Sequence, residues 1–308
     1  LVPVVLEQIL NSIMGTADTM MVSNVGSAAL SAVSLVDSIN VLLIQAFSAL
    51  AAGGAIVCAQ YIGQRNYEKA NMSARQVLFI ITAISVVVSA VCLIFQKPLL
   101  RLIFGAVDAD VMRASEIYFF FTALSFPFIA AYDSAASIFR AQENTKGPMT
   151  ISMISNIMNI GGNAVLIWVF HLGVAGAAIS TLVSRIFCAV VVLWQLRKDR
   201  QPVVVKDYLK IRPDWSMIGR ILGLGIPSGI ENSMFQLGKL AIQSTVSTLG
   251  TAAIAAQAMT NILENLNGIA AIGVGVGLMT IVGQCLGAGR KDEAVYYIKK
   301  LCVIAEAV

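Results

Sequence analysis

The sequence predicts an all-α protein, a polytopic transmembrane helix bundle, and three observations lead to that prediction. Of its 308 residues, 57% are hydrophobic and 12% are charged, with a mean hydropathy of +0.80, whereas soluble domains carry roughly 25% charged residues. Apolar runs of about 20 residues or more recur along the whole chain, and each is long enough to cross a bilayer as a helix. Residues 3–75 also align without a gap on residues 227–299, so the membrane segments are duplicated.

The repeat is a shift of 224 residues that brings chemically distinctive residues into register. Shared proline, glutamate, glutamine and glycine are not explained by the apolar composition alone. An even number of spans in each copy keeps both copies in the same orientation, so we expect a parallel repeat. It predicts two six-helix lobes, the second incomplete in this chain. The coinciding pairs are Pro3/Pro227, Glu7/Glu231, Gly26/Gly250, Gly53/Gly277, Gln60/Gln284, Gly63/Gly287 and Ala70/Ala294.

The hydropathy pattern divides the chain into eight complete spans and the beginning of a ninth. A hydrophilic segment with both charge signs separates two groups of spans, so we assign residues 1–196 to an amino-terminal six-helix lobe and residues 197–216 to a linker between lobes. Residues 217–308 would start the second lobe with two helices and part of a third, and we interpret the chain as truncated at its carboxy-terminal end. The expected spans are residues 1–22, 29–61, 72–96, 112–139, 149–170, 173–196, 217–247 and 252–284, with the ninth beginning near residue 293.

The basic residues predict the orientation in the membrane. Alternate connections, at residues 62–75, 140–147, 197–220 and 285–300, hold 16 of the 21 Lys and Arg. Because cytoplasmic loops are enriched in Lys and Arg, these connections and the amino terminus are expected on the cytoplasmic side of the cell (inner) membrane.

The first span carries two carboxylates on one helix face. Glu7 and Asp18 are 11 residues apart, which returns to nearly the same face, and Asn11 falls between them. Glu7 is expected near the cytoplasmic end, where it can reach water. An Asp at the bilayer centre costs about 2.5–3.5 kcal/mol on insertion scales, so Asp18 needs a partner, water or a function. Either it exchanges a sodium ion or a proton, or neighbouring side chains satisfy it for packing alone.

Polar residues also form stripes in other spans. Ser152, Ser155, Asn156, Asn159 and Asn163 share one face of the fifth span, where they either hydrogen-bond between helices or line an ion site.

In the repeat, Asp37 matches Asn261 and Asn40 matches Glu264, which favours a hydrated cavity between the lobes over interhelical bonding. Asp133 and Arg185 are expected to form a structural pair or to lie at the rim of that cavity. The candidate residues of a second cation or substrate site are Glu231, Asp37, Asn261 and Glu264.

Several functional classes lack the residues that they need. No G-x-x-x-x-G-K-[ST] motif is present to bind a nucleotide, the single histidine is His171, and the five cysteines are far apart. The run Gly273–Gly277 lies inside an apolar span, which indicates close helix packing. We therefore expect no cofactor, no metal, no nucleic acid and no enzymatic activity, and an ion gradient as the energy source.

Three segments resemble the multidrug and toxic compound extrusion (MATE) family of secondary transporters, in its prokaryotic form. They are Gly26-Ser-Ala-Ala-Leu-Ser, the turn Gln60-Tyr-Ile-Gly-Gln-Arg-Asn, and Gly173-Val-Ala-Gly-Ala-Ala-Ile-Ser-Thr. The resemblance implies twelve helices in two lobes, with a central cleft that opens alternately to each side. It also implies an antiporter that exports bulky, often cationic compounds in exchange for protons or sodium. We expect a monomer whose partners are a small-molecule substrate and the lipid bilayer.

The resemblance also implies an ion site in the amino-terminal lobe. Asp18, Asn159 and Thr181 match three of its residues, but Asn163 stands where the family has an Asp. The amide keeps an oxygen ligand and removes a charge, so Asp18 is the only carboxylate of that set. A Glu in the seventh helix takes part in cation binding in other members, and Glu231 lies in that helix.

Two other functions compete with this interpretation. A lipid-linked precursor flippase or polysaccharide exporter of a related fold would need a strongly cationic cavity, whereas Arg185 and Lys239 are the only basic residues more than four residues from the ends of the expected complete spans. A non-transporting membrane scaffold would not need carboxylates within its spans.

Overall fold

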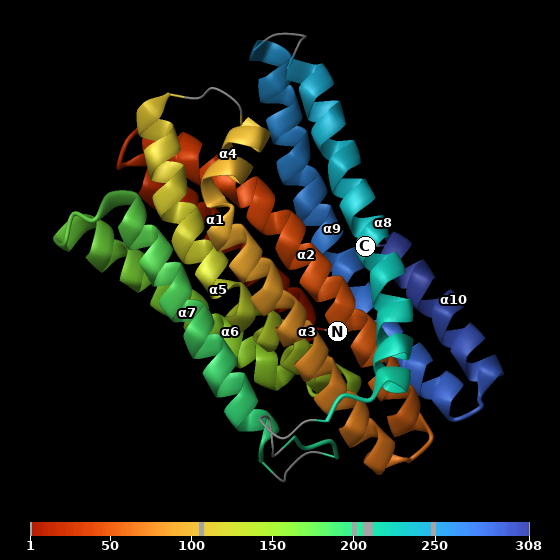
Figure 1. Ribbon diagram of the computed structural model, residues 1–308. Coiled ribbons are helices and arrows are strands. Elements are labelled where there is room, and N and C mark those ends of the chain that lie inside the picture. The colour runs from red at the N-terminus through yellow and green to blue at the C-terminus, as the bar shows by residue number, and fades with distance from the viewer. Residues whose placement is uncertain (1, 105–107, 199–201, 206–211, 248–250, 308) are drawn as a thin grey trace.

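The computed structural model describes residues 2–104, 108–198, 202–205, 212–247 and 251–307, and within these ranges the chain is helical with no strand (Figure 1). The helices are α1 (Val2–Ser23), α2 (Ser27–Gly63), α3 (Tyr67–Ile94), α4 (Gln96–Phe104), α5 (Ala109–Ala141), α6 (Lys146–Ala164) with the π-helical turn η1 (Val165–Val169), α7 (Gly173–Leu196), α8 (Trp215–Ser247), α9 (Thr251–Gly287) and α10 (Lys291–Ala307).

Each expected span corresponds to one of these helices, with boundaries that differ by a few residues, so the all-α bundle is confirmed. Among the described residues, five segments are apolar and long enough to cross a membrane: α2, α3, α5, α6 with η1, and α7. The short helix α4 was missed, because the sequence pattern ended the third span at residue 96. Gln96 anchors its start by donating a hydrogen bond to the backbone carbonyl of Glu116 in α5.

The internal repeat extends to the boundaries and caps of the helices. α2 and α9 both have 37 residues and occupy equivalent positions in the two copies, as do the starts of α3 and α10. Arg65 (φ 56°) and Gly289 (φ 76°) are equivalent left-handed residues that end α2 and α9. The next residue in each copy closes the same turn, because Asn66 N–H donates to Tyr61 O at 3.0 Å and Arg290 N–H to Cys285 O at 2.9 Å.

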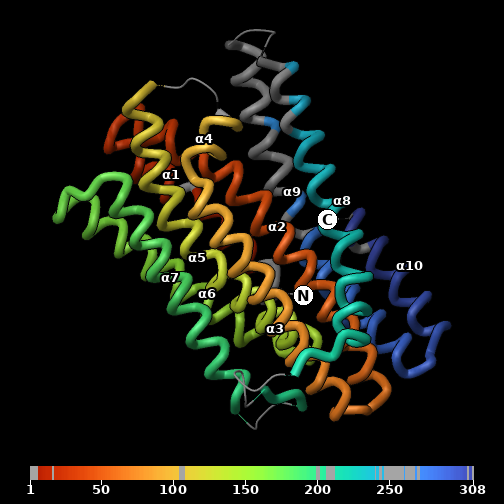
Figure 2. Tube along the Cα trace, in the orientation of Figure 1, coloured from red at the N-terminus to blue at the C-terminus, as the bar shows by residue number. Residues whose placement is uncertain are grey.

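Helix α2 is the central element of the bundle. It packs against α5 and α3 on one side and against α8 and α9 on the other, as Figure 2 shows. Phe47 of α2 meets Phe126 of α5 edge to face, with ring centroids 6.2 Å apart, and both side chains are buried. α2 therefore belongs to the core of the first lobe and also provides much of the surface on which the second lobe rests.

One end of the bundle holds the described parts of the connections that follow α2, α5, α7 and α9 (Figure 1). We call it the basic end, because these connections belong to the sequence ranges 62–75, 140–147, 197–220 and 285–300, which hold 16 of the 21 Lys and Arg. There α2 and α9 touch through equivalent glycines. A Cβ added to Gly63 would overlap the Gln284 carbonyl oxygen, and one added to Gly287 would overlap the Gln60 carbonyl oxygen. Only glycine fits at these two positions, and the two copies of the repeat meet backbone to backbone.

Side chains add to this contact between the copies. Arg220 of α8 donates hydrogen bonds to Gln60 Oε1 at 2.7 Å and to the Tyr61 hydroxyl at 3.1 Å. Gln284 of α9 donates to the Ala141 carbonyl at 2.9 Å, at the last residue of α5. These hydrogen bonds join the first lobe to α8 and α9 at the basic end.

The described parts of the linker pack against the helix bundle and form hydrogen bonds with it. Val203 and Val205 are fully buried, and Val203 N–H donates to Gln142 Oε1 at 3.0 Å. Gln76 of α3 donates to the Arg212 carbonyl at 2.7 Å and accepts from Asp214 N–H at 3.2 Å. The hydrophilic composition of this segment gave no indication of this anchoring.

We predict that Gly63→Ala and Gly287→Ala each lower the melting temperature of the protein in detergent. The added methyl group forces α2 and α9 apart, and overpacking of this kind costs about 1–3 kcal/mol. Thermal unfolding followed by circular dichroism measures the effect.

The matched control is Gly219→Ala in α8, where a Cβ meets nothing within 4 Å. Because alanine favours a helix over glycine, this variant should be neutral or slightly more stable. Equal melting temperatures for all three variants would contradict the close approach of α2 and α9.

Candidate functional site

A chain of polar side chains connects α1, α6 and α7. Asn159 and Asn163 are four residues apart on one face of α6. Asn163 Nδ2 donates to Asp18 Oδ1 at 2.5 Å and to Asn159 Oδ1 at 3.3 Å, while Asn159 Nδ2 donates to Thr181 Oγ1 at 3.3 Å. The four residues that the resemblance selected therefore lie together, hereafter the Asp18 cluster.

One buried oxygen atom of the Asp18 cluster accepts no hydrogen bond from the described residues and can act as a ligand. Asn159 and Asn163 are fully buried, Thr181 is buried, and Asp18 is partly buried. Asn163 Oδ1 has no hydrogen-bond partner among the described residues. A buried acceptor without a donor is costly, and hard cations prefer carboxylate and amide oxygens. The residues present thus fit a small cation, with Asp18 as the only carboxylate of the cluster.

Close packing of α6 on α7 positions the cluster. Ser180 Oγ donates to the Asn159 carbonyl at 2.8 Å, and a Cβ on Gly162 would overlap that same hydroxyl. A glycine at position 162 lets the two helices approach closely enough for Asn159 to reach Thr181.

The rest of the α6 stripe bonds to other helices. Asn11 of α1 accepts from Ser152 Oγ at 3.1 Å and from Asn156 Nδ2 at 3.0 Å, and Ser155 Oγ donates to the Ser184 carbonyl at 3.1 Å. Interhelical hydrogen bonding is therefore confirmed for this part of the stripe, and the ion-site alternative stays a prediction for Asn159 and Asn163.

Glu7 lies near the basic end, but the expectation that it reaches water is wrong. Its side chain is 3% exposed and forms an ion pair with Arg140 Nη2 at 3.1 Å. The Tyr132 hydroxyl lies 3.2 Å from Glu7 Oε1 and from the Pro148 carbonyl oxygen. Arg140 was assigned to a loop, whereas it belongs to α5 and turns into the bundle.

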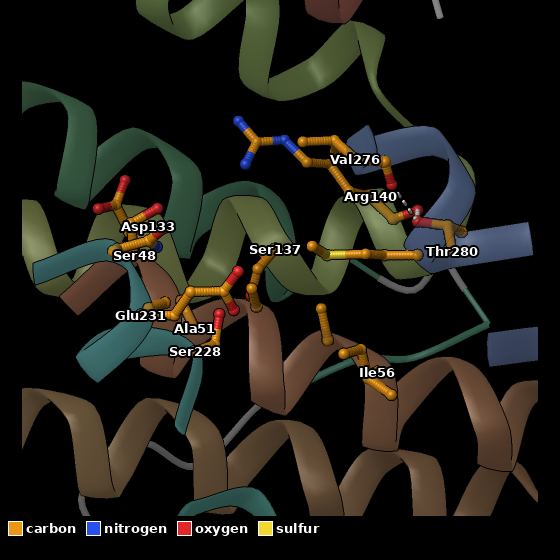
Figure 3. Close-up of a pocket in the computed structure, with 15 residues that line it drawn as sticks. Ser48, Ala51, Ile56, Asp133, Ser137, Arg140, Ser228, Glu231, Val276 and Thr280 are labelled. Atoms are coloured by element: carbon orange, nitrogen blue, oxygen red, sulfur yellow. Dashed lines mark hydrogen bonds between the residues drawn. The ribbon is translucent and has the colours of Figure 1, made fainter. Parts of the chain in front are cut away.

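A cavity of about 310 Å³ lies between α2, α5, α8 and α9. Two carboxylates line it, Asp133 from α5 and Glu231 from α8, together with the Arg140 side chain, as Figure 3 shows. A second cavity of about 450 Å³ continues towards the basic end and shares Arg140, Val276 and Thr280 with the first. We call the first of these the central cavity.

Asp133 and Arg185 do not form an ion pair in the described part of the chain. Arg185 Nη1 instead donates to Ser125 Oγ at 2.6 Å, and Asp133 lines the central cavity. The alternative that Asp133 lies at the cavity is therefore the better description.

The candidates for a second site do not form one cluster. Glu231 faces the central cavity, whereas Asp37 accepts hydrogen bonds from Asn40 Nδ2 and the Tyr118 hydroxyl, both at 3.2 Å, between α2 and α5. The side chains of Asn261 and Glu264 lie outside the described residues. Sequence reasoning missed Arg140, Tyr118 and Tyr132, because nothing local indicates which distant carboxylate each one contacts.

Comparison with known proteins identifies a family whose sequence model matches both copies of the repeat. The sequence model of the family described as MatE matches residues 3–165 and 227–307. The two matches begin at positions that are equivalent in the repeat, which independently supports the duplication.

Two relatives have similar sequences over nearly the whole chain. One is the Bacillus subtilis "Probable multidrug resistance protein YoeA", 27% identical over 302 residues, which are 95% of this chain and 64% of that protein. The other is the Thermotoga maritima "Probable multidrug resistance protein NorM", 24% identical over 305 residues, covering 97% and 64%. The chain thus spans about 64% of the length of these relatives.

A solved structure has a similar fold. It is described as the "Outward-facing conformation of a multidrug resistance MATE family transporter of the MOP superfamily", and it aligns with a TM-score of 0.91 at 19% identity. The alignment covers 98% of this chain and 67% of that one. At this identity the likeness concerns the fold alone.

We predict that Arg140→Met destabilises the protein by about 3–5 kcal/mol, because it leaves the buried Glu7 carboxylate without its partner. The double variant Glu7→Leu/Arg140→Met should recover most of that loss, since two apolar side chains leave no charge uncompensated. Thermal unfolding of the purified variants measures both.

The control is the surface ion pair between Arg290 and Glu293, whose side chains are 65% and 53% exposed. Glu293→Gln should change stability by less than about 1 kcal/mol. An Arg140→Met variant as stable as this control would mean that the buried pair does not hold α1 to α5.

Proposed function

The chain belongs to the MatE family, whose sequence model matches most of its length, and from this we propose that the full-length protein is a secondary active antiporter. It is a multi-pass membrane protein of a transporter family. In our proposal it exports bulky, often cationic compounds in exchange for sodium or protons and needs no other cofactor.

The charge of the central cavity is the observation that supports a cationic substrate. Asp133 and Glu231 line it, and neither takes part in an ion pair in the described part of the chain. Arg140 lines it too, but its guanidinium is neutralised by Glu7 at 3.1 Å. The lining is therefore acidic, which favours an organic cation over the anionic head group that a flippase would carry.

The Asp18 cluster, which lies in the amino-terminal lobe, supports coupling of substrate export to the entry of an ion. A cation bound by Asp18, Asn159, Asn163 and Thr181 would offset the cost of a carboxylate in the membrane interior. It would compete with Asn163 for Asp18 Oδ1, a contact of 2.5 Å. Because Asn11 also ties α1 to α6, an altered Asp18 contact would shift α1 as a unit, and substrate release would follow ion entry.

The proposed orientation places the basic end at the cytoplasmic face of the cell (inner) membrane. At that end α2 and α9 are in backbone contact, which blocks a path for the substrate between these two helices. This arrangement supports a state that releases its substrate to the outer side, and we propose a monomer as the transporting unit.

We predict that Asp18→Asn in the full-length protein abolishes ion-driven export while the protein still inserts into the membrane. In inverted membrane vesicles, a fluorescent organic cation should move in response to a sodium pulse or a proton pulse in the wild type but not in Asp18→Asn. Asp110→Asn, a change of the same chemistry at an exposed residue of α5, serves as the control. Normal transport by Asp18→Asn would refute coupling through Asp18, and a wild type that responds to neither ion would favour lipid-linked substrates.

We also predict that Glu231→Gln weakens binding of that fluorescent cation by about tenfold, or ~1.4 kcal/mol, because it removes one charge from the central cavity. Fluorescence anisotropy with purified protein measures the dissociation constant. Binding of an uncharged analogue should not change, nor should cation binding by Glu68→Gln at an exposed position of α3. Equal losses for the charged and the uncharged compound would show that Glu231 acts through shape rather than charge.

A further inference from the structure

We propose that Asp37 is the second acid of the cation site in the amino-terminal lobe and supplies the negative charge that Asn163 lacks. This inference rests on the proposed function, because it concerns the coupling ion, and it adds a residue from a helix outside the Asp18 cluster. The ligand is a monovalent cation, and sodium is the one tested.

The first support is the depth of the residues. Asp18, Asp37 and Tyr118 lie at most ten residues from the same end of α1, α2 and α5, opposite the basic end. At 1.5 Å per residue, all three are within about 15 Å of that end. Asp37 and Asp18 therefore lie in the same half of the bundle, and their depths differ by about 8 Å.

The second support is the electrostatic link between the two acids. The charge of Asp37 acts on Asp18, and the charge of Arg185 acts on both. Arg185 is fixed by its hydrogen bond to Ser125 at 2.6 Å. Asp133 also acts on Arg185, but its side chain lines the central cavity rather than the Asp18 cluster.

These charges do not balance. Two carboxylates, Asp18 and Asp37, lie within electrostatic range of one guanidinium, that of Arg185, which leaves one negative charge in the lobe interior. An uncompensated buried charge costs several kcal/mol, and a single monovalent cation removes that cost. With Asp37 changed to an amide, Arg185 alone would balance Asp18, and the attraction for a cation would be lost.

The third support is an acceptor beside Asp37 that has no donor. Asn40 donates through Nδ2 to Asp37 Oδ1 at 3.2 Å, which holds its amide against the carboxylate. Its Oδ1 is buried and has no hydrogen-bond partner among the described residues, and the Asn40 side chain is 3% exposed. Tyr118, also buried, donates its hydroxyl proton to the same Oδ1 of Asp37 and keeps its oxygen lone pairs. Carboxylate, amide and phenol oxygens here can hold the ion as it approaches or leaves Asp18.

The test is binding of ²²Na⁺ to the purified full-length protein in detergent, without substrate and without a gradient. We expect Asp37→Asn to weaken sodium binding by about 10–100-fold, the range found when residues that support a metal site are changed. Tyr118→Phe, which removes one hydroxyl, should weaken it severalfold. Asp110→Asn at an exposed site should leave it unchanged.

The decisive variant is Asp37→Asn/Asn163→Asp, which moves the carboxylate from α2 to α6 and keeps the total charge. It should regain sodium binding, which a purely structural role of Asp37 does not predict. Wild-type affinity in Asp37→Asn overturns the proposal, and so does the absence of rescue in a folded, monodisperse double variant or of sodium binding in the wild type. If Asp37→Asn does not fold, unchanged affinity in Tyr118→Phe overturns it.

Sodium binding and export of an organic cation are measured separately, so either proposal can be refuted without the other. If the purified protein binds sodium with the expected rescue but vesicles that contain it export no organic cation, the two-acid site is retained and the proposed cargo is refuted. Cation export that persists in Asp37→Asn, with unchanged sodium affinity, would retain the antiporter and refute the role of Asp37.

Discussion

The cost of placing charge in a low-dielectric helix bundle determines how the polar residues of this protein are arranged. Hydrocarbon offers no hydrogen bonds, so each ionisable group within the spans needs a partner from another helix or access to water. Glu7 is satisfied by Arg140 and by the Tyr132 hydroxyl, at 3.1 and 3.2 Å. Asp18 and Asp37 accept hydrogen bonds from neutral donors instead, and such donors leave their charges uncancelled. That difference separates a structural ion pair from groups that can take up a cation.

Helix α2 connects the two regions that a transporter must coordinate. Near one end it carries Asp37, which is linked electrostatically to Asp18, and at the other end Gly63 touches Gln284 of α9. Its middle lines the central cavity through Ser48 and the alanines that follow. A rigid helix that bears on the proposed ion site, the proposed substrate cavity and the contact between lobes can transmit a small rotation from one to the others. No separate pathway of side chains is required for that coupling.

The duplication explains why the contact at the basic end is symmetric. Because Gly63 and Gly287 are equivalent, as are Gln60 and Gln284, each glycine of one copy faces the glutamine backbone of the other. An isologous contact of this kind forms and opens as one unit, since both halves depend on the same approach of α2 and α9. The polar sites are not symmetric, because the position equivalent to Asp18 in α8 is Ile242. The repeat therefore supplies the frame, and among the aligned residues only the first copy has the aspartate of the Asp18 cluster.

The sequence by itself determined the helices, the repeat and the polar faces, because hydropathy and residue spacing along one helix are local properties. The resemblance to a family added the Asp18 cluster, and Asp18, Asn159, Asn163 and Thr181 do lie together. Only the tertiary structure decided that Glu7 pairs with Arg140, that Asp37 lies between Asn40 and Tyr118 rather than in the central cavity, and that the linker is anchored under α3 and α5. These outcomes depend on how each helix is rotated about its axis and which distant face it meets. Interhelical packing sets that rotation, and no periodicity within a single segment encodes it.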